Sequence, residues 1–362
     1  MLGVGTLATG IIAEVDALGT VHRGSLRLGW RIRGEDGWLV PGRDRPAHRT
    51  RPHPAPVAYT VLRVSGGAAI ERVYAVGDGG GGVVVVEVEN DSPAAIAVSF
   101  VVDAPGVVAV GDDGVRVDGK PTVAFTRRPG AVEDGGVFVY PVPHRTTVRI
   151  ALTDAAVDVR ALADADAVVR SWDRVLDRGL RTELPEPLQS AVDAARADLL
   201  LAPPSAEAFV ALEAWGFDGE AIEMWARLRM RARRAARRSS ARPTSRDMLV
   251  ETRAALVREE GRTIEILPGF RPAWLGEQLA AHDVPLRRGL CSFAVRWHGA
   301  RPALLWDVPP GSTVRAPELD PAWSSDEPVG ETLLAAAPAS LLSMGERAPL
   351  PGTSVDAPEQ FS

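Results

Sequence analysis

The sequence has 362 residues, of which 46% are hydrophobic and 24% charged, and a formal net charge of −6 at pH 7. This length predicts more than one domain, and the composition is that of a globular protein with a buried core. The acidic balance gives no general attraction to nucleic acid, the single cysteine excludes an intramolecular disulfide, and no apolar stretch reaches the ~18 residues of a membrane-spanning helix, so we expect neither a nucleic-acid nor a membrane partner.

The N-terminal residues indicate neither a secretory signal nor a nucleotide-binding loop. No basic region precedes their apolar stretch, which Glu14 and Asp16 interrupt, so we expect no signal peptide and a cytoplasmic location. The glycines of residues 3–10 imitate a phosphate-binding loop. However, no strand precedes them and no Gly-Lys-Ser/Thr follows.

The first 155 residues show the patterns of β-strands. Residues 26–33 (LRLGWRIR) alternate apolar and polar side chains, which predicts a strand with one buried face. Other short runs rich in valine and other strand formers predict further strands at 83–88, 96–102, 115–117, 123–126, 137–140 and 147–152. Because turn residues separate these runs and no helical period intervenes, we expect an antiparallel β-sandwich. The Arg-, His- and Pro-rich residues 41–56 predict a long exposed loop.

The hydrophobic period becomes helical near residue 160. The predicted helices span 162–180, 188–201, 206–215, 219–238 and a last one that Ser245 caps and that ends at Glu260. Ser205 and Asp218 are suited to cap the third and fourth helices, and Gly216 suits the left-handed residue between them. These two helices therefore predict an αα-hairpin with a tight corner.

Strands return in the C-terminal part of the chain. They are predicted at 263–267, 291–298 and 302–308, and the last two form a hairpin. Cys291 lies in the strand-like run CSFAVRW, which indicates a buried structural thiol. The Pro-, Ala- and Ser-rich end predicts a disordered tail. The expected organisation is a β-sandwich domain at 1–155, an αα-hairpin segment at 156–285, a β cap at 286–335 and a tail at 336–362.

Three stretches, in this order after a β-sandwich, resemble the six-hairpin glycoside hydrolases of the glucoamylase and trehalase type. ALEAWGFDGEA (211–221) is similar to a helix–corner–helix unit of their barrel. VREEG, IEILPG and PAWLG (within 257–276) are similar to the end of the barrel and its closing strand. LCSFAVRWHG with RPALLW (290–306) is similar to their C-terminal hairpin. The resemblance implies an antiparallel β-super-sandwich, an (α/α)6 barrel, a β-hairpin cap and carbohydrate metabolism.

The helical segment is short for such a barrel. Twelve helices with their loops need roughly 200 residues, and residues 161–285 predict about five helices. We therefore expect an α+β multidomain protein with a partial (α/α)6 barrel. Its expected function is that of a degenerate glycoside hydrolase, a pseudoenzyme with weak or no hydrolytic activity that binds an oligosaccharide.

Glu213 and Glu220 flank the Gly216 corner and are the candidate catalytic pair. Glycoside hydrolysis takes one carboxyl group to protonate the leaving oxygen and a second to act as base or nucleophile. The alternative is that Glu220 complements the N-terminus of its helix and that Glu213 is solvated. Trp215 and Trp274 are the candidate binding residues, because sugars stack on indole rings. We expect no cofactor and no metal, since the six histidines lack ligand spacing.

The alternative function is a non-enzymatic scaffold that assembles through its helical segment. An incomplete barrel leaves apolar helix faces without a partner, and a two-fold homodimer is the simplest cover for them. The residues expected on such a face are Val168, Trp172, Leu176, Leu212, Trp215, Ile222 and Trp225. Residues 227–246 hold nine arginines. That run indicates a phosphate or nucleic-acid patch, a contact with an acidic partner, or a solvated helix end.

Overall fold

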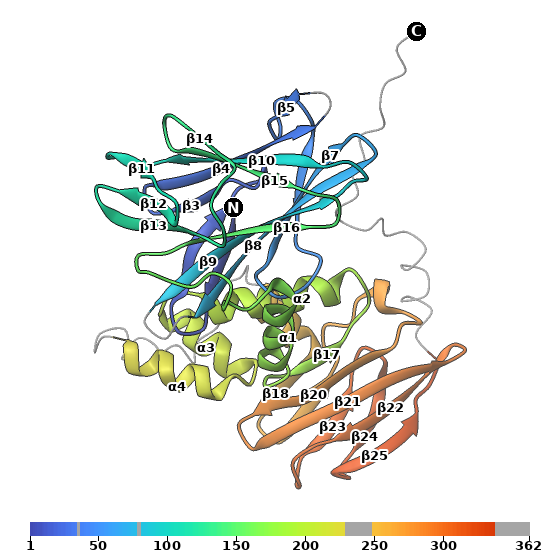
Figure 1. Ribbon diagram of the computed structural model, residues 1–362. Coiled ribbons are helices and arrows are strands. Elements are labelled where there is room, and N and C mark those ends of the chain that lie inside the picture. The colour runs from blue at the N-terminus through green and yellow to red at the C-terminus, as the bar shows by residue number, and fades with distance from the viewer. Residues whose placement is uncertain (35–36, 78–80, 229–247, 337–362) are drawn as a thin grey trace. The chain divides into compact units, whose positions relative to one another are not determined.

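The computed structural model describes residues 1–34, 37–77, 81–228 and 248–336. The fold is α+β and consists mostly of antiparallel sheets, with a sheet-rich N-terminal region (Figure 1). Two compact units divide the chain. Of the described residues, those within 1–178, 190–212 and 219–228 form the N-terminal unit, and those within 179–189, 213–218 and 248–336 form the C-terminal unit.

Two eight-stranded antiparallel sheets form most of the N-terminal unit. The first has the order β1-β2-β3-β4-β10-β15-β14, with β5 paired to β4. Its strands are β1 (Leu2–Thr6), β2 (Gly10–Val15), β3 (Val21–Arg23), β4 (Leu26–Gly34), β5 (Gly37–Leu39), β10 (Ile96–Asp103), β14 (Ala131–Glu133) and β15 (Val137–Val142). The second has the order β11-β12-β13-β16-β9-β8-β7-β6. Its strands are β6 (Ala47–Thr50), β7 (Ala58–Val64), β8 (Gly67–Gly77), β9 (Gly82–Asp91), β11 (Val108–Val110), β12 (Gly114–Val117), β13 (Lys120–Phe125) and β16 (Thr147–Leu152).

Side chains from both sheets bury one shared apolar cluster. Strand β4 alternates buried and more exposed positions along its length, as its sequence predicted. The rings of Phe100 and Phe138, from neighbouring strands, lie 5.5 Å apart in the cluster. The described residues between 57 and 150 contain no helix, so the prediction of a β-rich N-terminal region is confirmed.

Residues 41–56 correct the prediction of a long exposed loop. Strand β6 forms within them and pairs with β7 at the edge of the second sheet, and Ala47 and Ala55 are buried. Two of the four arginines that made this stretch look wet donate to backbone carbonyl groups. Arg49 donates to the Val15 carbonyl oxygen, and Arg51 Nε donates to that of Ala55 over 3.1 Å. A run of arginines is therefore compatible with ordered edge structure here.

Five α-helices are described: α1 (Ala165–Leu176), α2 (Leu188–Leu201), α3 (Ala206–Ala214), α4 (Asp218–Arg227) and α6 (Met248–Leu256). They form no closed barrel. Ser205 Oγ accepts a hydrogen bond from Ala208 N over 3.0 Å, and Gly216 has a φ of +73°, so the predicted Ser205 cap and the left-handed residue between α3 and α4 are confirmed. Ser245 and the expected continuation of α4 to residue 238 fall outside the described residues.

The last helix is shorter than predicted. It ends at Leu256, and Val257–Glu260 form strand β18, which pairs with β19 (Thr263–Ile266) through a turn at Gly261. Val257 and Ile266, which are partners in this pairing, are both buried. Burial alternates along Val257–Glu260, as it does in a strand with one covered face. The predicted helix therefore ends at Leu256, and the four residues after it are a hairpin strand.

The C-terminal unit contains two smaller sheets. One has five strands: β17 (Arg181–Glu183), β20 (Leu279–Leu286), β21 (Gly289–His298), β22 (Arg301–Asp307) and β25 (Val329–Leu333). The other has four: β18, β19, β23 (Thr313–Ala316) and β24 (Asp320–Ser325), of which β19 and β23 are parallel. The predicted hairpin is β21–β22. Of the predicted tail, all but residue 336 lies outside the described residues.

Cys291 on β21 is completely buried. Burial raises the pKa of its thiol to about 12, so the prediction of an unreactive structural cysteine is consistent with its surroundings. In the part of the chain that the structure describes, no helix has the length and apolarity to cross a membrane.

Candidate functional site

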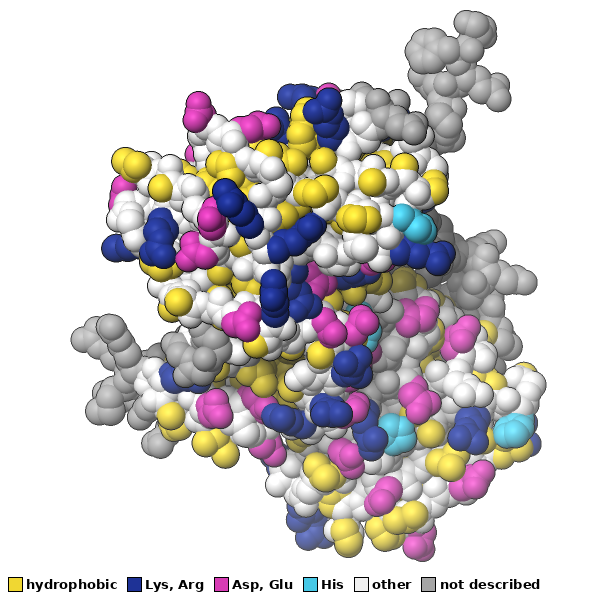
Figure 2. Space-filling model, viewed as in Figure 1, with side chains coloured by type: hydrophobic (Ala, Val, Ile, Leu, Met, Phe, Trp, Pro, Cys, Tyr) yellow, Lys and Arg dark blue, Asp and Glu magenta, His cyan; other side chains and the backbone are white. Residues whose placement is uncertain are grey.

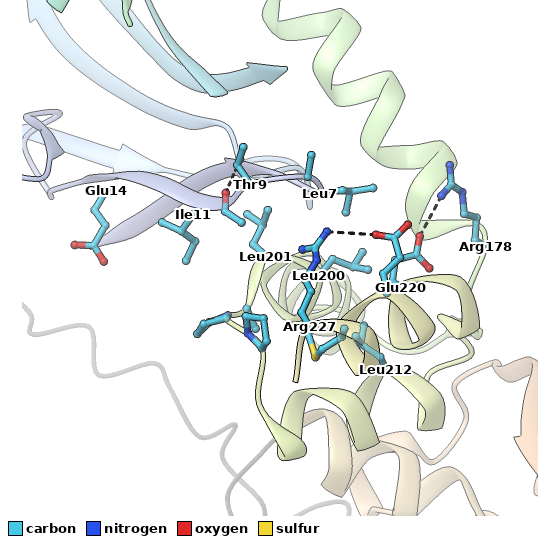
Figure 3. A pocket seen from close by; sticks show the side chains of 17 residues that line it. Leu7, Thr9, Ile11, Glu14, Arg178, Leu200, Leu201, Leu212, Glu220 and Arg227 are labelled. Atoms are coloured by element: carbon cyan, nitrogen blue, oxygen red, sulfur yellow. Dashed lines mark hydrogen bonds and ion pairs between the residues drawn. The ribbon is translucent and has the colours of Figure 1, made fainter. Parts of the chain in front are cut away.

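A cleft of about 660 Å³ opens in the N-terminal unit, within the usual size range of ligand pockets. We call it the hairpin cleft, because the tip of the β1–β2 hairpin forms one of its walls (Figure 3). Arg178, which follows α1, the C-terminal end of α2, Leu212 of α3 and one face of α4 contribute the other walls. The side chains that matter below are those of Leu7, Ile11, Glu14, Arg178, Leu200, Leu201, Glu220, Glu223, Met224 and Arg227.

Glycines set the shape of the hairpin. A Cβ atom at Gly5 would lie 2.0 Å from the Gly10 carbonyl oxygen, so the two strands approach closely only without a side chain there. Gly10 has a φ of +69°, and a Cβ atom on it would lie 3.3 Å from the Leu201 carbonyl oxygen. The hairpin tip therefore lies against the end of α2. Thr6 and Thr9 fix the turn through a 2.8 Å bond between their hydroxyl groups.

Two ion pairs line the cleft. Arg178 Nη1 lies 3.1 Å from Glu220 Oε1, and Arg227 Nη2 lies 3.6 Å from Glu223 Oε2. Figure 3 shows both as dashed lines, with the arginine of the second pair directed toward the middle of the cleft. Glu220 and Glu223 share a face of α4 because they are three residues apart. The wall thus offers carboxylate acceptors and guanidinium donors side by side.

A buried arginine holds the helices beneath this wall. Arg196 on α2 is 4% exposed, and its guanidinium donates to Asp193 Oδ1 over 2.8 Å and to the Leu176 carbonyl oxygen at the end of α1. Burial lowers the pKa of Arg196, against the opposing effect of Asp193. This contact fixes the end of α1, and Arg178 follows two residues later.

Only one of the two predicted catalytic residues lines the cleft. Glu220 does, with a side chain that is 18% exposed. Glu213 is exposed at the end of α3 and belongs to the C-terminal unit. Partial burial and the charge of Asp218 raise the pKa of Glu213, which is the direction that a general acid needs.

The two predicted stacking platforms are buried. Trp215 is 0% exposed, and its indole N–H donates to the Leu249 carbonyl oxygen over 3.2 Å. Trp274 is 3% exposed, and its ring contacts Phe270 and the Arg271 guanidinium. Neither ring has a free face, which argues against sugar stacking at these positions.

The apolar helix face expected in a homodimer is also largely covered within the chain. Val168, Trp172, Leu176, Leu212 and Trp215 are all buried. Trp225 is half-buried, with its ring 5.1 Å from that of Phe209, and Ile222 is 70% exposed. Most of the residues that were expected to form an exposed apolar patch are therefore buried. The homodimer stays a prediction.

Several cleft residues were missed by the sequence analysis. Glu223 and Arg227 were missed, although together with the predicted Glu220 they lie at helical spacing on α4, a pattern that could have marked one polar face. No local signal joins the hairpin tip to helices that follow it by almost two hundred positions.

Of the arginine run 227–246, Arg227 lines the cleft, and residues 229–246 lie outside the described part. On the face in Figure 2, basic and acidic side chains are interspersed.

The described residues contain no group of three or more His, Cys, Asp or Glu side chains placed to hold a metal ion. Comparison of the chain with family models, with curated proteins and with solved structures finds no match.

Proposed function

We propose that the protein is a degenerate relative of the six-hairpin glycoside hydrolases that binds a saccharide and hydrolyses it weakly or not at all. In this proposal the two eight-stranded sheets are an N-terminal antiparallel β-super-sandwich. The helices are an incomplete (α/α)6 barrel, and the strands of residues 286–335 belong to a C-terminal β cap. The order of sheet-rich region, αα-hairpin and C-terminal strands supports this assignment.

The observation that carries the proposal is the mixed lining of the hairpin cleft. A sugar hydroxyl both donates and accepts hydrogen bonds, so adjacent carboxylates and guanidinium groups suit it. The two ion pairs nearly cancel in charge, which favours an uncharged ligand. Leu200, Leu201 and Met224 supply apolar surface for the C–H face of a sugar ring.

The same lining argues against efficient hydrolysis. A glycosidase needs a protonated carboxyl group on one side of the scissile bond and a second carboxylate about 5–9.5 Å away. Glu220 and Glu223 both come from α4, so they lie on one side of the cleft, and each pairs with an arginine. Glu14, from the hairpin, points away from both (Figure 3). Among the residues that the structure describes, the cleft therefore has no opposed acid and base.

Calorimetric titration with maltose, trehalose and isomaltose tests the proposal. We expect binding of at least one of them in the range of about 10 µM to 1 mM, and turnover far below the ~10 per second of an ordinary enzyme. Glu220→Gln and Arg227→Met should each weaken binding about tenfold or more, because each removes a charged hydrogen-bonding group. Glu207→Gln, an exposed glutamate of α3 outside the cleft, is the matched control and should bind normally.

Turnover near the ordinary rate that Glu213→Gln or Glu220→Gln abolishes would show that the hydrolytic machinery is intact. Absence of binding to all three sugars would contradict carbohydrate recognition. A dimer in sedimentation would then favour the scaffold function.

A further inference from the structure

A second cavity, of about 350 Å³, lies in the same unit beside the hairpin cleft. The hairpin, the end of β8 and one face of α1 form its walls. We call it the apolar groove, because its lining is almost entirely apolar. Trp172, Val168 and Val175 of α1 are its large side chains, and Ala75 and Ala167 are among the small ones that leave the space open.

The groove and the hairpin cleft adjoin each other. Leu7 and Ala8, at the hairpin tip, line both cavities. Ala8 is exposed, so a ligand can pass over the tip from one cavity to the other. The other connection is the end of α1, where Val175 lines the groove and Arg178, three residues later, lines the cleft. One continuous surface thus changes from charged to apolar around the hairpin tip.

We infer that the ligand is a glycoside with an apolar aglycone, whose saccharide occupies the hairpin cleft and whose alkyl chain occupies the apolar groove. This inference rests on the proposed carbohydrate binding and adds the class of ligand to it. A free sugar would leave the groove unused, because its hydroxyl groups find no polar partners beside Val168 and Trp172. An alkyl chain joined to the sugar fits the change in lining.

The expected gain in affinity follows from burial of the chain. A fully buried methylene group improves binding about fourfold, and a groove that is open on one side gives less than this. A hexyl chain has five more methylene groups than a methyl group. We therefore expect hexyl α-D-glucoside to bind at least about tenfold more tightly than methyl α-D-glucoside.

The test compares these two glucosides, and hexanol, by calorimetric titration of the full chain. Ala167→Leu fills the groove from α1 without touching the cleft. It should reduce the affinity for the hexyl glucoside to that for the methyl glucoside and leave the latter unchanged. Ser171→Leu, on the same lining, should act in the same way if Ala167→Leu does not fold. Ala191→Leu, a matched enlargement at an exposed position of α2 outside both cavities, should change neither affinity.

Each outcome has a defined meaning. Equal affinities for the methyl and hexyl glucosides would overturn the aglycone site and leave the carbohydrate proposal standing. Binding of neither glucoside would overturn the aglycone site, and the carbohydrate proposal would fall with it only if maltose, trehalose and isomaltose do not bind either. Hexanol binding as tightly as hexyl glucoside, and equally sensitive to Ala167→Leu, would mean that the groove acts independently of any sugar, and this too would overturn the inference.

Discussion

Two glutamates on neighbouring strands of the second sheet are both buried, but their surroundings are opposite. Glu87 on β9 is 5% exposed, and its Oε1 accepts hydrogen bonds from Tyr74 Oη over 2.6 Å and from Arg149 Nε over 2.8 Å. Glu71 on β8 is 1% exposed, and its Oε2 has no hydrogen-bond partner in the described structure. One carboxyl group is buried with a charge partner and the other without one.

Strand pairing places the two on different faces of the sheet. Glu71 is the partner of Val88, which belongs to the shared apolar cluster, and Glu87 precedes Val88 on β9. Because side chains alternate along a strand, Glu71 points toward the core and Glu87 points away from it. A carboxyl group in an apolar core favours its neutral form, whereas one beside a guanidinium group is stabilised as an anion. The same residue type thus serves two different purposes within one sheet.

The largest expected effect comes from removing the partner of Glu87. Arg149→Met leaves a buried carboxylate without its cation, and we expect a loss of about 3 kcal/mol in the free energy of unfolding. Arg23→Met is the matched control. The side chains of Arg23 and Arg149 are each 19% exposed. The side chain of Asp154, the partner of Arg23, is 87% exposed, whereas the side chain of Glu87 is 6% exposed. The control should lose at most about 1 kcal/mol. Denaturant unfolding measures both variants. Equal losses of unfolding free energy in Arg149→Met and Arg23→Met would contradict the difference between the buried and the exposed ion pair.

The contrast between Glu71 and Glu87 also shows what the sequence could reveal. Alternation along β4, the valine-rich run of β9 and helical spacing along α1 predicted the elements, because such patterns report which residues are buried. The period cannot say what covers a buried face. Glu71 looks like a polar position of a strand, and its burial depends on residues more than forty positions earlier.

The candidate site follows the same rule. Glu220 was found because a capped corner exposes the start of α4, which is a local feature. Arg178 joins it from the turn that follows α1, and the hairpin tip comes from near the N-terminus. Trp215 and Trp274 were expected to stack against sugars, but the same composition suits rings packed inside a unit. Contacts between distant segments decide this, and local patterns do not encode them.

The second expected effect concerns Gly19, which lies directly over Glu71. Its φ is +88°, and a Cβ atom on it would lie 2.0 Å from Glu71 Oε2, 2.6 Å from Trp30 Nε1 and 2.8 Å from Thr60 Oγ1. Gly19→Ala should therefore cost about 2–3 kcal/mol, since it combines backbone strain with displacement of this buried cluster. Gly37→Ala isolates the backbone cost, because Gly37 has a φ of +92° and open space at its Cβ position. If the free energy of unfolding falls no more in Gly19→Ala than in Gly37→Ala, the side chains of Glu71, Trp30 and Thr60 move aside at little cost.

The third expected effect is the one that depends on pH. Burial raises the pKa of Glu71 well above its ordinary value, and the charge of Asp16 acts in the same direction. Because the folded-state pKa is the higher one, the stability that Glu71 contributes is complete below its unfolded pKa of about 4.3 and is lost as the pH rises through the folded pKa.

Glu71→Gln keeps the shape and removes the titration. Across the interval between the two pKa values, the stability of the variant relative to the parent protein should rise with pH, by at most about 1.4 kcal/mol per pH unit. Glu87→Gln is the comparison, since it changes a carboxyl group that already has a partner. It should be destabilised at neutral pH, because Arg149 then lacks its counter-charge. Urea unfolding at a series of pH values from 4 to 8 measures both variants. If the parent and Glu71→Gln stability curves are parallel over that range, Glu71 is not the neutral carboxyl group without a cationic partner that the comparison with Glu87 requires.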